Sequence, residues 1–246
     1  MTDLPTSARP HTAFVLAAGM GSRMRPLTDD KPKPMVRLAG RPLVDHVLDR
    51  LQAIGVERAV VNVHYKAEVL MAHLAERRIP QILLSDERDR LLDTGGGVVA
   101  ARALLGDDPY FIHNSDTVWI EHGVSNLARM IAEWDPQRMD SLLLLARRDA
   151  SIGYDGAGDF LLQADGRLLR RPAGGEADYV FAGVSIAHPR LFDEAPPPPF
   201  SLNVAWNSAL ASGRLYGIVL DGLWMHVGTP EALAEAEGCI RDGRRG

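Results

Sequence analysis

Cysteine is almost absent from this sequence. Cys239 is the single cysteine among 246 residues, so no disulfide can form within the chain, which is consistent with a reducing compartment. No apolar run reaches the ~18–20 residues that a membrane-spanning helix needs. The first eleven residues also lack the apolar core of a signal peptide. We therefore expect a cytoplasmic protein with no membrane segment, in which Cys239 has a structural role.

An excess of positive charge is missing as well. The chain has 27 Lys and Arg against 32 Asp and Glu, which gives a formal net charge of -5. There is no overall basic field to hold nucleic acid, so no nucleic-acid partner is expected. Positive charge is concentrated locally at Arg23, Arg25, Lys31 and Lys33. That concentration favours a small anionic ligand over a polyanion.

Internal repeats are the third absence. No hexapeptide repeat follows residue 230, so no appended β-helix domain is expected. The length and the 46% content of hydrophobic residues fit one α/β domain with a substantial core. We expect a loose tail over residues 1–11 and a single domain over residues 12–246.

Apolar runs and helical periodicity alternate along the first 146 residues. Short apolar runs predict strands at 12–16, 59–63, 81–85, 110–113 and 141–146. Helical spacing and helix-ending residues predict helices at 42–54, 67–77, 98–105 (opened by three glycines) and 124–134. This alternation predicts a Rossmann-like α/β fold, with an open, mixed, mostly parallel sheet and helices on both faces.

The pattern changes in residues 147–246. A hairpin is expected over 159–171, turning at Asp165-Gly166, followed by a strand at 179–187. The four prolines of 196–199 predict a stiff surface bend. The remaining expected elements are helices at 202–212 and 230–241 and a strand at 215–220. This half is expected to be a smaller, β-rich part that ends in a helix.

A glycine-containing loop over residues 16–28 follows the first expected strand. Small residues let a backbone approach a ligand closely, and successive N–H groups can surround a phosphate. Met24 stands where a dinucleotide fingerprint needs its third glycine, and no Gly-Lys-Ser/Thr sequence is present for a Walker A loop. Two interpretations remain, a phosphate loop served by Arg23, Arg25 and Lys33, or a tight turn with solvated basic residues.

Several motifs resemble those of the sugar-nucleotide pyrophosphorylases, a family of nucleotidyltransferases. They run along nearly the whole chain: Gly19-x-Gly21-x-Arg23-Met24-x-Pro26-Leu27-Thr28, Pro32-Lys33-Pro34, Asp93-Thr94-Gly95-Gly96-Gly97, Asn114-Ser115-Asp116, Phe181-Ala182-Gly183-Val184 and Trp224-Met225-His226-Val227-Gly228-Thr229-Pro230. The resemblance implies transfer of a nucleoside monophosphate from a nucleoside triphosphate to a sugar 1-phosphate, with release of pyrophosphate. It implies a nucleotide-binding half over 12–146 and a sugar-binding half over 147–246.

The resemblance also implies substrates. The short single-domain form favours UTP and N-acetylmuramate 1-phosphate, and thus a place in peptidoglycan recycling. GTP with mannose 1-phosphate is the alternative. A catalytically silent sensor of nucleotide sugars and, less favoured, a nicotinamide-binding oxidoreductase are the rival functions. The chain is expected to be a monomer or a weak homodimer.

Roles for individual residues follow from the same resemblance. Arg23, Lys33 and Asp116 are the implied catalytic residues, since Arg and Lys balance phosphate charge. The implied nucleotide-binding residues are Ala17, Ala18, Gly19, Gly21, Thr94, Gly95 and Gly96. Close packing at a helix start is the alternative for the three glycines 95–97. The implied sugar-binding residues are Asn114, Gly183 and Asn203, with Asn62 and Glu87 as weaker candidates and Trp206 more typical of a core residue.

Metal binding is expected to depend on Asp116, because a carboxylate at a strand end can hold Mg²⁺ against triphosphate oxygens. Ser115 replaces the usual family glycine before it. His226 occupies the position of the family's second metal-binding Asp, and imidazole is a poor ligand for Mg²⁺ and a better one for softer ions such as Mn²⁺. His226 is therefore expected either to face the metal or phosphate, or only to hydrogen-bond within the turn before the last helix.

Overall fold

The structure, a computed structural model, describes residues 9–243; most of the expected tail lies outside them. Its centre is a nine-stranded sheet. Four neighbouring strands are parallel, in the order β5 (Gln81–Asp86), β4 (Arg58–Val63), β1 (Thr12–Leu16) and β6 (Tyr110–Asn114). Each is a short apolar run, as parallel strands covered on both faces require. The prediction of these four strands is confirmed to within one residue at each end.

The sheet becomes mixed in the second half of the chain. Strand β11 (Tyr179–Ala187) runs antiparallel to both β6 and β8 (Ser141–Arg147), and β12 (Leu215–Val219) continues the sheet parallel to β8. The predicted hairpin is present as β9 (Phe160–Leu162) and β10 (Leu168–Arg170), paired antiparallel beside β11. The predicted mixed sheet is therefore confirmed.

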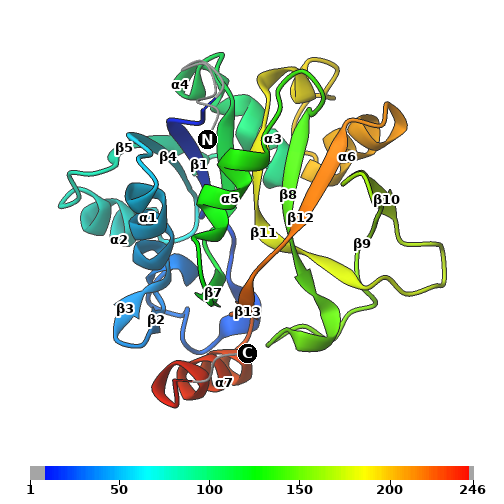
Figure 1. Ribbon diagram of the computed structural model, residues 1–246. Coiled ribbons are helices and arrows are strands. Elements are labelled where there is room, and N and C mark those ends of the chain that lie inside the picture. Colours follow the sequence, from blue (N-terminus) through cyan, green and yellow to red (C-terminus); the bar gives the residue numbers. More distant parts are fainter. Residues whose placement is uncertain (1–8, 244–246) are drawn as a thin grey trace.

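Helices cover both faces of this sheet (Figure 1). One core cluster combines inward residues of α1 (Leu43–Ala53), α2 (Ala67–Leu74) and α5 (Asn126–Glu133) with Ala13 and Val15 of β1. The other combines α3 (Asp93–Ala100), α4 (Arg102–Leu105) and α6 (Leu202–Ala211) with Phe14 of β1. Successive side chains of a strand point to opposite faces, so one short strand serves two cores. Trp206 of α6 is buried in the second cluster, as a core residue.

A third apolar cluster lies beside the main sheet. It joins the two-stranded ribbon of β7 (Thr117–Glu121) and β13 (Gly222–His226) to helix α7 (Pro230–Arg241), where Cys239 is buried. Nearby short elements are β2 (Arg37–Leu38), β3 (Arg41–Pro42) and the 3-10 helices η2 (Ser22–Met24) and η3 (Lys33–Met35), with η4 (Arg148–Ala150) and η5 (Pro189–Phe192) elsewhere. The structural role expected for Cys239 agrees with its burial.

Three sequence predictions need correction. The ribbon of β7 and β13 was not predicted, because its strands pair outside the main sheet. Helix α2 ends at Leu74, three residues before the predicted end at 77. Helix α3 begins at Asp93, so the glycines 95–97 lie inside it rather than before it, and it breaks from α4 at Ala101. Close packing explains why glycines stand in a helix there, as described below. Within residues 9–243, no helix has both the length and the apolar character of a membrane span.

His113 lies near the carboxyl end of β6 and is fully buried. Its ring stacks on Trp119 with centroids 5.6 Å apart, and Nδ1 lies 2.7 Å from the carbonyl oxygen of Asn114. Burial, helped by the nearby Arg50 guanidinium, lowers the pKa of His113 to about 4, below its ordinary 6.5. The imidazole is therefore neutral in the folded protein at neutral pH.

This burial predicts a pH dependence of stability. The unfolded chain takes up a proton at this histidine near pH 6.5, whereas the folded chain does so only near pH 4. Stability is therefore lost as the pH falls from 7 to 5, and this histidine contributes about 2 kcal/mol to the loss. His113→Gln should lose about 2 kcal/mol less than wild type over that range in denaturant unfolding. Parallel pH profiles for the two proteins would contradict the prediction.

Candidate active site

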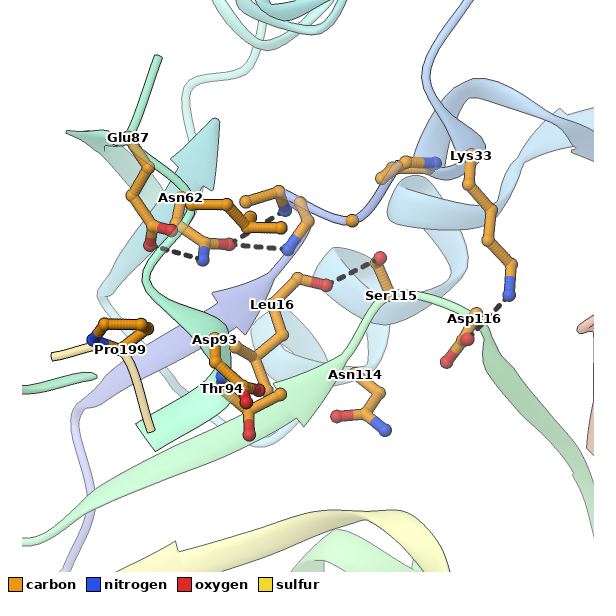
Figure 2. A pocket seen from close by; sticks show the side chains of 15 residues that line it. Leu16, Lys33, Asn62, Glu87, Asp93, Thr94, Asn114, Ser115, Asp116 and Pro199 are labelled. Carbon is orange, nitrogen blue, oxygen red and sulfur yellow. Dashed lines mark hydrogen bonds and ion pairs between the residues drawn. The ribbon is translucent and has the colours of Figure 1, made fainter. Parts of the chain in front are cut away.

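A cavity of about 500 Å³ opens at the carboxyl ends of β1, β4 and β6 (Figure 2). In an open α/β sheet this edge is where loops diverge and ligands bind, at the point where strand order reverses. The reversal lies between β1 and β6, because the chain runs from β1 outward through β4 to β5 and then returns to β6 on the other side of β1. The lining residues are Leu16, Ala17, Ala18, Gly19, Lys33, Pro34, Asn62, Glu87, Leu91, Asp93, Thr94, Asn114, Ser115, Asp116 and Pro199.

Lys33 and Asp116 form an ion pair at one end of this cavity. The Nζ of Lys33 donates to Oδ2 of Asp116 at 2.7 Å, and their side chains are 12% and 21% exposed. Burial alone would raise the pKa of Asp116, but the Lys33 ammonium and the His226 imidazole outweigh it and hold that pKa well below its usual range. The sequence predicted both residues for the site, and the structure brings them together across 83 positions of sequence.

His226 reaches the same carboxylate from the other side. It is the last residue of β13 and pairs with Thr117 of β7, which places its Nε2 3.5 Å from Oδ2 of Asp116. Its ring also stacks on Trp224 with centroids 5.9 Å apart. Of the two expectations for His226, this position favours the one in which it faces the site; metal ligation stays a prediction.

The second oxygen of Asp116 matters for metal binding. Oδ1 is buried and has no hydrogen-bond partner in the structure. A buried acceptor without a partner is costly unless a ligand completes it. The described residues contain no group of three or more His, Cys, Asp or Glu side chains arranged for a metal ion. One carboxylate oxygen could anchor a hydrated hard cation such as Mg²⁺, which needs few protein ligands and usually keeps several waters.

The loop after β1 is held by a buried network. Oδ1 of Asn62 accepts hydrogen bonds from the backbone N–H groups of Ala17 at 2.6 Å and Ala18 at 3.2 Å. Nδ2 of Asn62 donates to Oε1 of Glu87 at 2.7 Å. The amides of Ala17 and Ala18 are therefore engaged within the protein, so backbone donors for a phosphate have to come from Gly19 onward. Gly21 turns the loop with a φ of 63°, where the hydroxyl of Thr28 donates to its carbonyl.

The start of α3 explains the run of glycines. A Cβ at Gly95 would lie 2.4 Å from the ring of Phe200, and the N–H groups of Gly95 and Gly96 both donate to the carbonyl of Phe200. Thr94 lines the cavity, but these two glycines face the loop before α6 instead. The arrangement favours close packing as their role; a nucleotide contact through them stays a prediction.

Other predicted site residues lie beyond the cavity lining. Arg23 is exposed on η2, in the same loop as Gly21. Gly183 lies at the irregular point of β11 with a φ of 87°, and a Cβ there would lie 2.5 Å from Thr117. Asn203 of α6 accepts a hydrogen bond from Arg170. Asn114 is in the lining, so the predicted sugar-binding set is only partly gathered around this cavity.

Asn62 and Glu87 were predicted only as weaker candidates for sugar binding. Both are buried at the cavity, and each is 2% exposed. A signal was available for Asn62, because a polar side chain inside the apolar run of β4 has to find partners when it is buried. Nothing local indicated that its partners lie after β1 and β5.

Several known proteins are similar to this chain along most of its length. The family model of the MobA-like NTP transferase domain matches residues 13–194. Two similar proteins carry the name N-acetylmuramate alpha-1-phosphate uridylyltransferase. The protein from Caulobacter vibrioides is 48% identical over 240 residues, or 96% of this chain and 99% of that protein. The protein from Neisseria meningitidis serogroup B is 32% identical over 92% of this chain and 96% of that protein.

More distant matches cover less of the relative or share only the fold. The mannose-1-phosphate guanylyltransferase catalytic subunit beta of Dictyostelium discoideum is 28% identical over 92% of this chain and 63% of its own length. A UDP-glucose pyrophosphorylase solved with UDP-glucose is 16% identical and superimposes with a TM-score of 0.78, covering 96% of this chain and 100% of that chain. The last match shows the fold, and it agrees with the mixed, mostly parallel sheet.

The ion pair at the cavity predicts a stability effect of removing Lys33. The depressed pKa of Asp116 means that the pair stabilises the fold above the ordinary carboxylate pKa, and that this contribution is lost as the pH falls below it. Lys33→Met at pH 7 leaves the carboxylate with only His226 and should cost about 2 kcal/mol in denaturant unfolding. Adding Asp116→Asn should recover most of that loss.

Lys31→Met provides the matched control. Lys31 pairs at 3.4 Å with the exposed Asp30, so its replacement should change stability by less than about 0.5 kcal/mol. Additive effects of Lys33→Met and Asp116→Asn, with no recovery in the double variant, would contradict the prediction.

Proposed function

The chain belongs to the MobA-like NTP transferase family of nucleotidyltransferases, and we propose that it transfers UMP from UTP to N-acetylmuramate 1-phosphate. The products are pyrophosphate and the uridine diphosphate sugar. The names of the two relatives that match almost end to end support this substrate pair. The proposal implies a role in peptidoglycan recycling, and its use of a nucleoside triphosphate fits a cytoplasmic location.

One observation carries the proposal. The cavity has the Lys33–Asp116 pair at one end, while Asn62, Glu87 and Thr94 line the other (Figure 2). A nucleoside triphosphate carries its charge at one end only, and that end matches the end of the cavity where Lys33 lies. The loop after β1, from Ala17 to Gly19, lines the stretch between them.

The proposed reaction is a single displacement. An oxygen of the sugar phosphate, already anionic at neutral pH, attacks the α-phosphorus of the triphosphate in line. A new P–O bond forms, the bond from the α-phosphorus to the bridging oxygen breaks, and pyrophosphate leaves with the electron pair. No general base is required, so catalysis rests on positioning and on charge balance. In this proposal Lys33 and Arg23 stabilise the charge that builds up on the phosphate oxygens.

Asp116 is the residue that would hold Mg²⁺, through its unpartnered Oδ1. The ion would supply positive charge against the triphosphate oxygens. Lys33 holds the other oxygen of the same carboxylate, which fixes the direction of the free one. His226 approaches Oδ2 of this carboxylate at 3.5 Å, and its imidazole would suit a softer ion such as Mn²⁺ better than Mg²⁺.

Two other functions are compatible with this chain. Transfer of GMP to mannose 1-phosphate is supported by relatives such as the Dictyostelium protein, at lower identity and lower coverage. A silent sensor is favoured only by His226 in the usual place of an acidic ligand. The assignment of residues 12–146 to the nucleotide and 147–246 to the sugar remains a prediction, as does a monomeric or weakly dimeric state.

A substrate panel tests the proposal. We expect the purified protein to release pyrophosphate fastest with UTP and N-acetylmuramate 1-phosphate, among UTP, GTP, dTTP, CTP and ATP combined with several sugar 1-phosphates. The expected preference over GTP with mannose 1-phosphate is about 10²-fold in kcat/KM, the size that one or two unpaired buried hydrogen bonds produce. A preference for GTP with mannose 1-phosphate would replace the proposal with the first alternative, and no turnover with any pair would favour the sensor.

Asp116→Asn tests the metal assignment. The change keeps the shape of the side chain and removes the charge, so metal-dependent turnover should fall by about 10²-fold or more while UTP still binds. Asp30→Asn is the control, since Asp30 also pairs with a lysine but is exposed on the loop. Turnover of the Asp116 variant within about threefold of wild type at saturating Mg²⁺ would remove this residue from the mechanism.

A further inference from the structure

Asn62 and Glu87 form a buried polar pair among the residues that line the cavity. Asn62 is the second-last residue of β4, and Glu87 directly follows the last residue of β5. The two are joined by the hydrogen bond from Nδ2 to Oε1 (Figure 2). Glu87 also accepts a hydrogen bond from the N–H of Leu92 at 3.2 Å, through Oε2. The pair thereby connects the backbone of Ala17 and Ala18 to the segment just before α3.

Both connected segments form the cavity wall. Ala17 and Ala18 begin the loop after β1, and Leu91, Asp93 and Thr94, the neighbours of Leu92, border the cavity on the side of α3. The bonds leave the pair little freedom, because Oδ1 of Asn62 already accepts two N–H groups and each oxygen of Glu87 accepts one. Buried groups joined by several hydrogen bonds hold one geometry, since each lost bond is costly.

Gly97 gives an independent sign that this geometry is specified. A Cβ at Gly97 would lie 2.6 Å from Oε1 of Glu87 and 3.2 Å from Nδ2 of Asn62. Helix α3 can therefore approach the pair only because this position has no side chain. The third glycine of the run serves the buried pair, whereas Gly95 and Gly96 serve the contact with Phe200.

We infer that Asn62 and Glu87 are positioning residues for nucleotide binding. They act through the backbone of Ala17, Ala18 and Leu92, setting the distance between the two segments that enclose the nucleotide. This inference rests on the proposed function, because it assigns the wall to the nucleotide. Its consequence is specific: the pattern of donors and acceptors in the pair matters, and the location of the negative charge within it does not.

A reciprocal exchange of the two side chains tests that consequence. In the double variant Asn62→Asp with Glu87→Gln, the carboxylate at position 62 still accepts from Ala17 and Ala18. The amide at position 87 donates to that carboxylate and accepts from Leu92. Every hydrogen bond of the network is retained and the net charge is unchanged. Each single variant breaks the pattern at a pH high enough to ionise both carboxylates: Asn62→Asp then places two acceptors face to face, and Glu87→Gln cannot accept from both of its donors.

The readout is steady-state kinetics with the substrate pair that wild type uses best, at a temperature where all variants are folded. Asn62→Asp should raise the KM for the nucleoside triphosphate by about tenfold or more, and Glu87→Gln by a smaller factor. The KM for the sugar phosphate should stay within about twofold, a split that simple loss of folded protein would not produce. The double variant should return to within about threefold of the wild-type KM for the triphosphate.

Asn126→Asp is the matched control. Asn126 is also fully buried and accepts from the backbone N–H of Asp221, but it lies outside the cavity lining. It should lower stability without changing either KM. A double variant no better than Asn62→Asp would overturn the inference and indicate that the Glu87 carboxylate itself contacts the nucleotide. Wild-type KM values in both single variants would overturn it as well.

Failure of the proposed function can be told apart from failure of this inference. If wild type turns over no substrate pair, amide hydrogen exchange of the peptide spanning residues 14–22 replaces kinetics as the readout. Exchange should be faster in Asn62→Asp than in wild type and slow again in the double variant. Equal exchange in all three proteins would show that the pair does not hold the loop.

Discussion

The position of β1 between two parallel neighbours is the constraint on which the site depends. β1 pairs with β4 along one edge and with β6 along the other, so all three strands end at the same side of the sheet. The chain continues from β1 into the loop that leads to Lys33, and from β6 through Asp116 into β7 of the ribbon. Space opens between these diverging connections, and the side chains that follow each strand point into it. Lys33 and Asp116 can meet only because this topology brings the two connections together.

Two ionisable side chains near this edge are held in opposite ways, one charged and one neutral. Asp116 is kept charged by Lys33 and His226, although one of its oxygens is buried and unpartnered. His113, three positions earlier in the sequence and on β6, is kept neutral by burial. Asp116 therefore gives the cavity one fixed negative charge, and Lys33 beside it gives one fixed positive charge. His113 adds no charge. Such fixed charges stabilise developing charge without having to reorganise.

Much of the fold could be predicted from the sequence, because its parallel strands are continuous apolar runs with clear turn residues between them. Strand β11, the hairpin of β9 and β10, and helix α7 agree closely with the predicted ranges. The ribbon of β7 and β13 could not be predicted, since its partners are about 100 residues apart and neither pairs with the main sheet. Helix α3 contradicts the low helix propensity of its glycines, because contact with Phe200 and Glu87 outweighs that local preference.

Prediction of the site was similarly uneven. Lys33, Asp116 and Thr94 could be predicted from motifs, and all three line the cavity. Asn62 and Glu87 belong to no quoted motif, and their importance appears only when strand ends that are distant in sequence become neighbours. Arg23, Gly183 and Asn203 do not line this cavity. Their motifs identify neighbours along the chain but do not specify where each residue points in the folded protein.

The pairing of β7 with β13 has a consequence for the order in which the protein can become active during synthesis. β7 ends at Glu121, and the strand it pairs with ends at His226, close to the last described residues. β6 likewise receives its second neighbour, β11, only after residue 187 has been made. A nascent chain that has emerged only through β8 has an unfinished sheet edge, and its Asp116 lacks His226. The edge that carries Asp116 therefore cannot be completed on the ribosome before residue 226 has emerged.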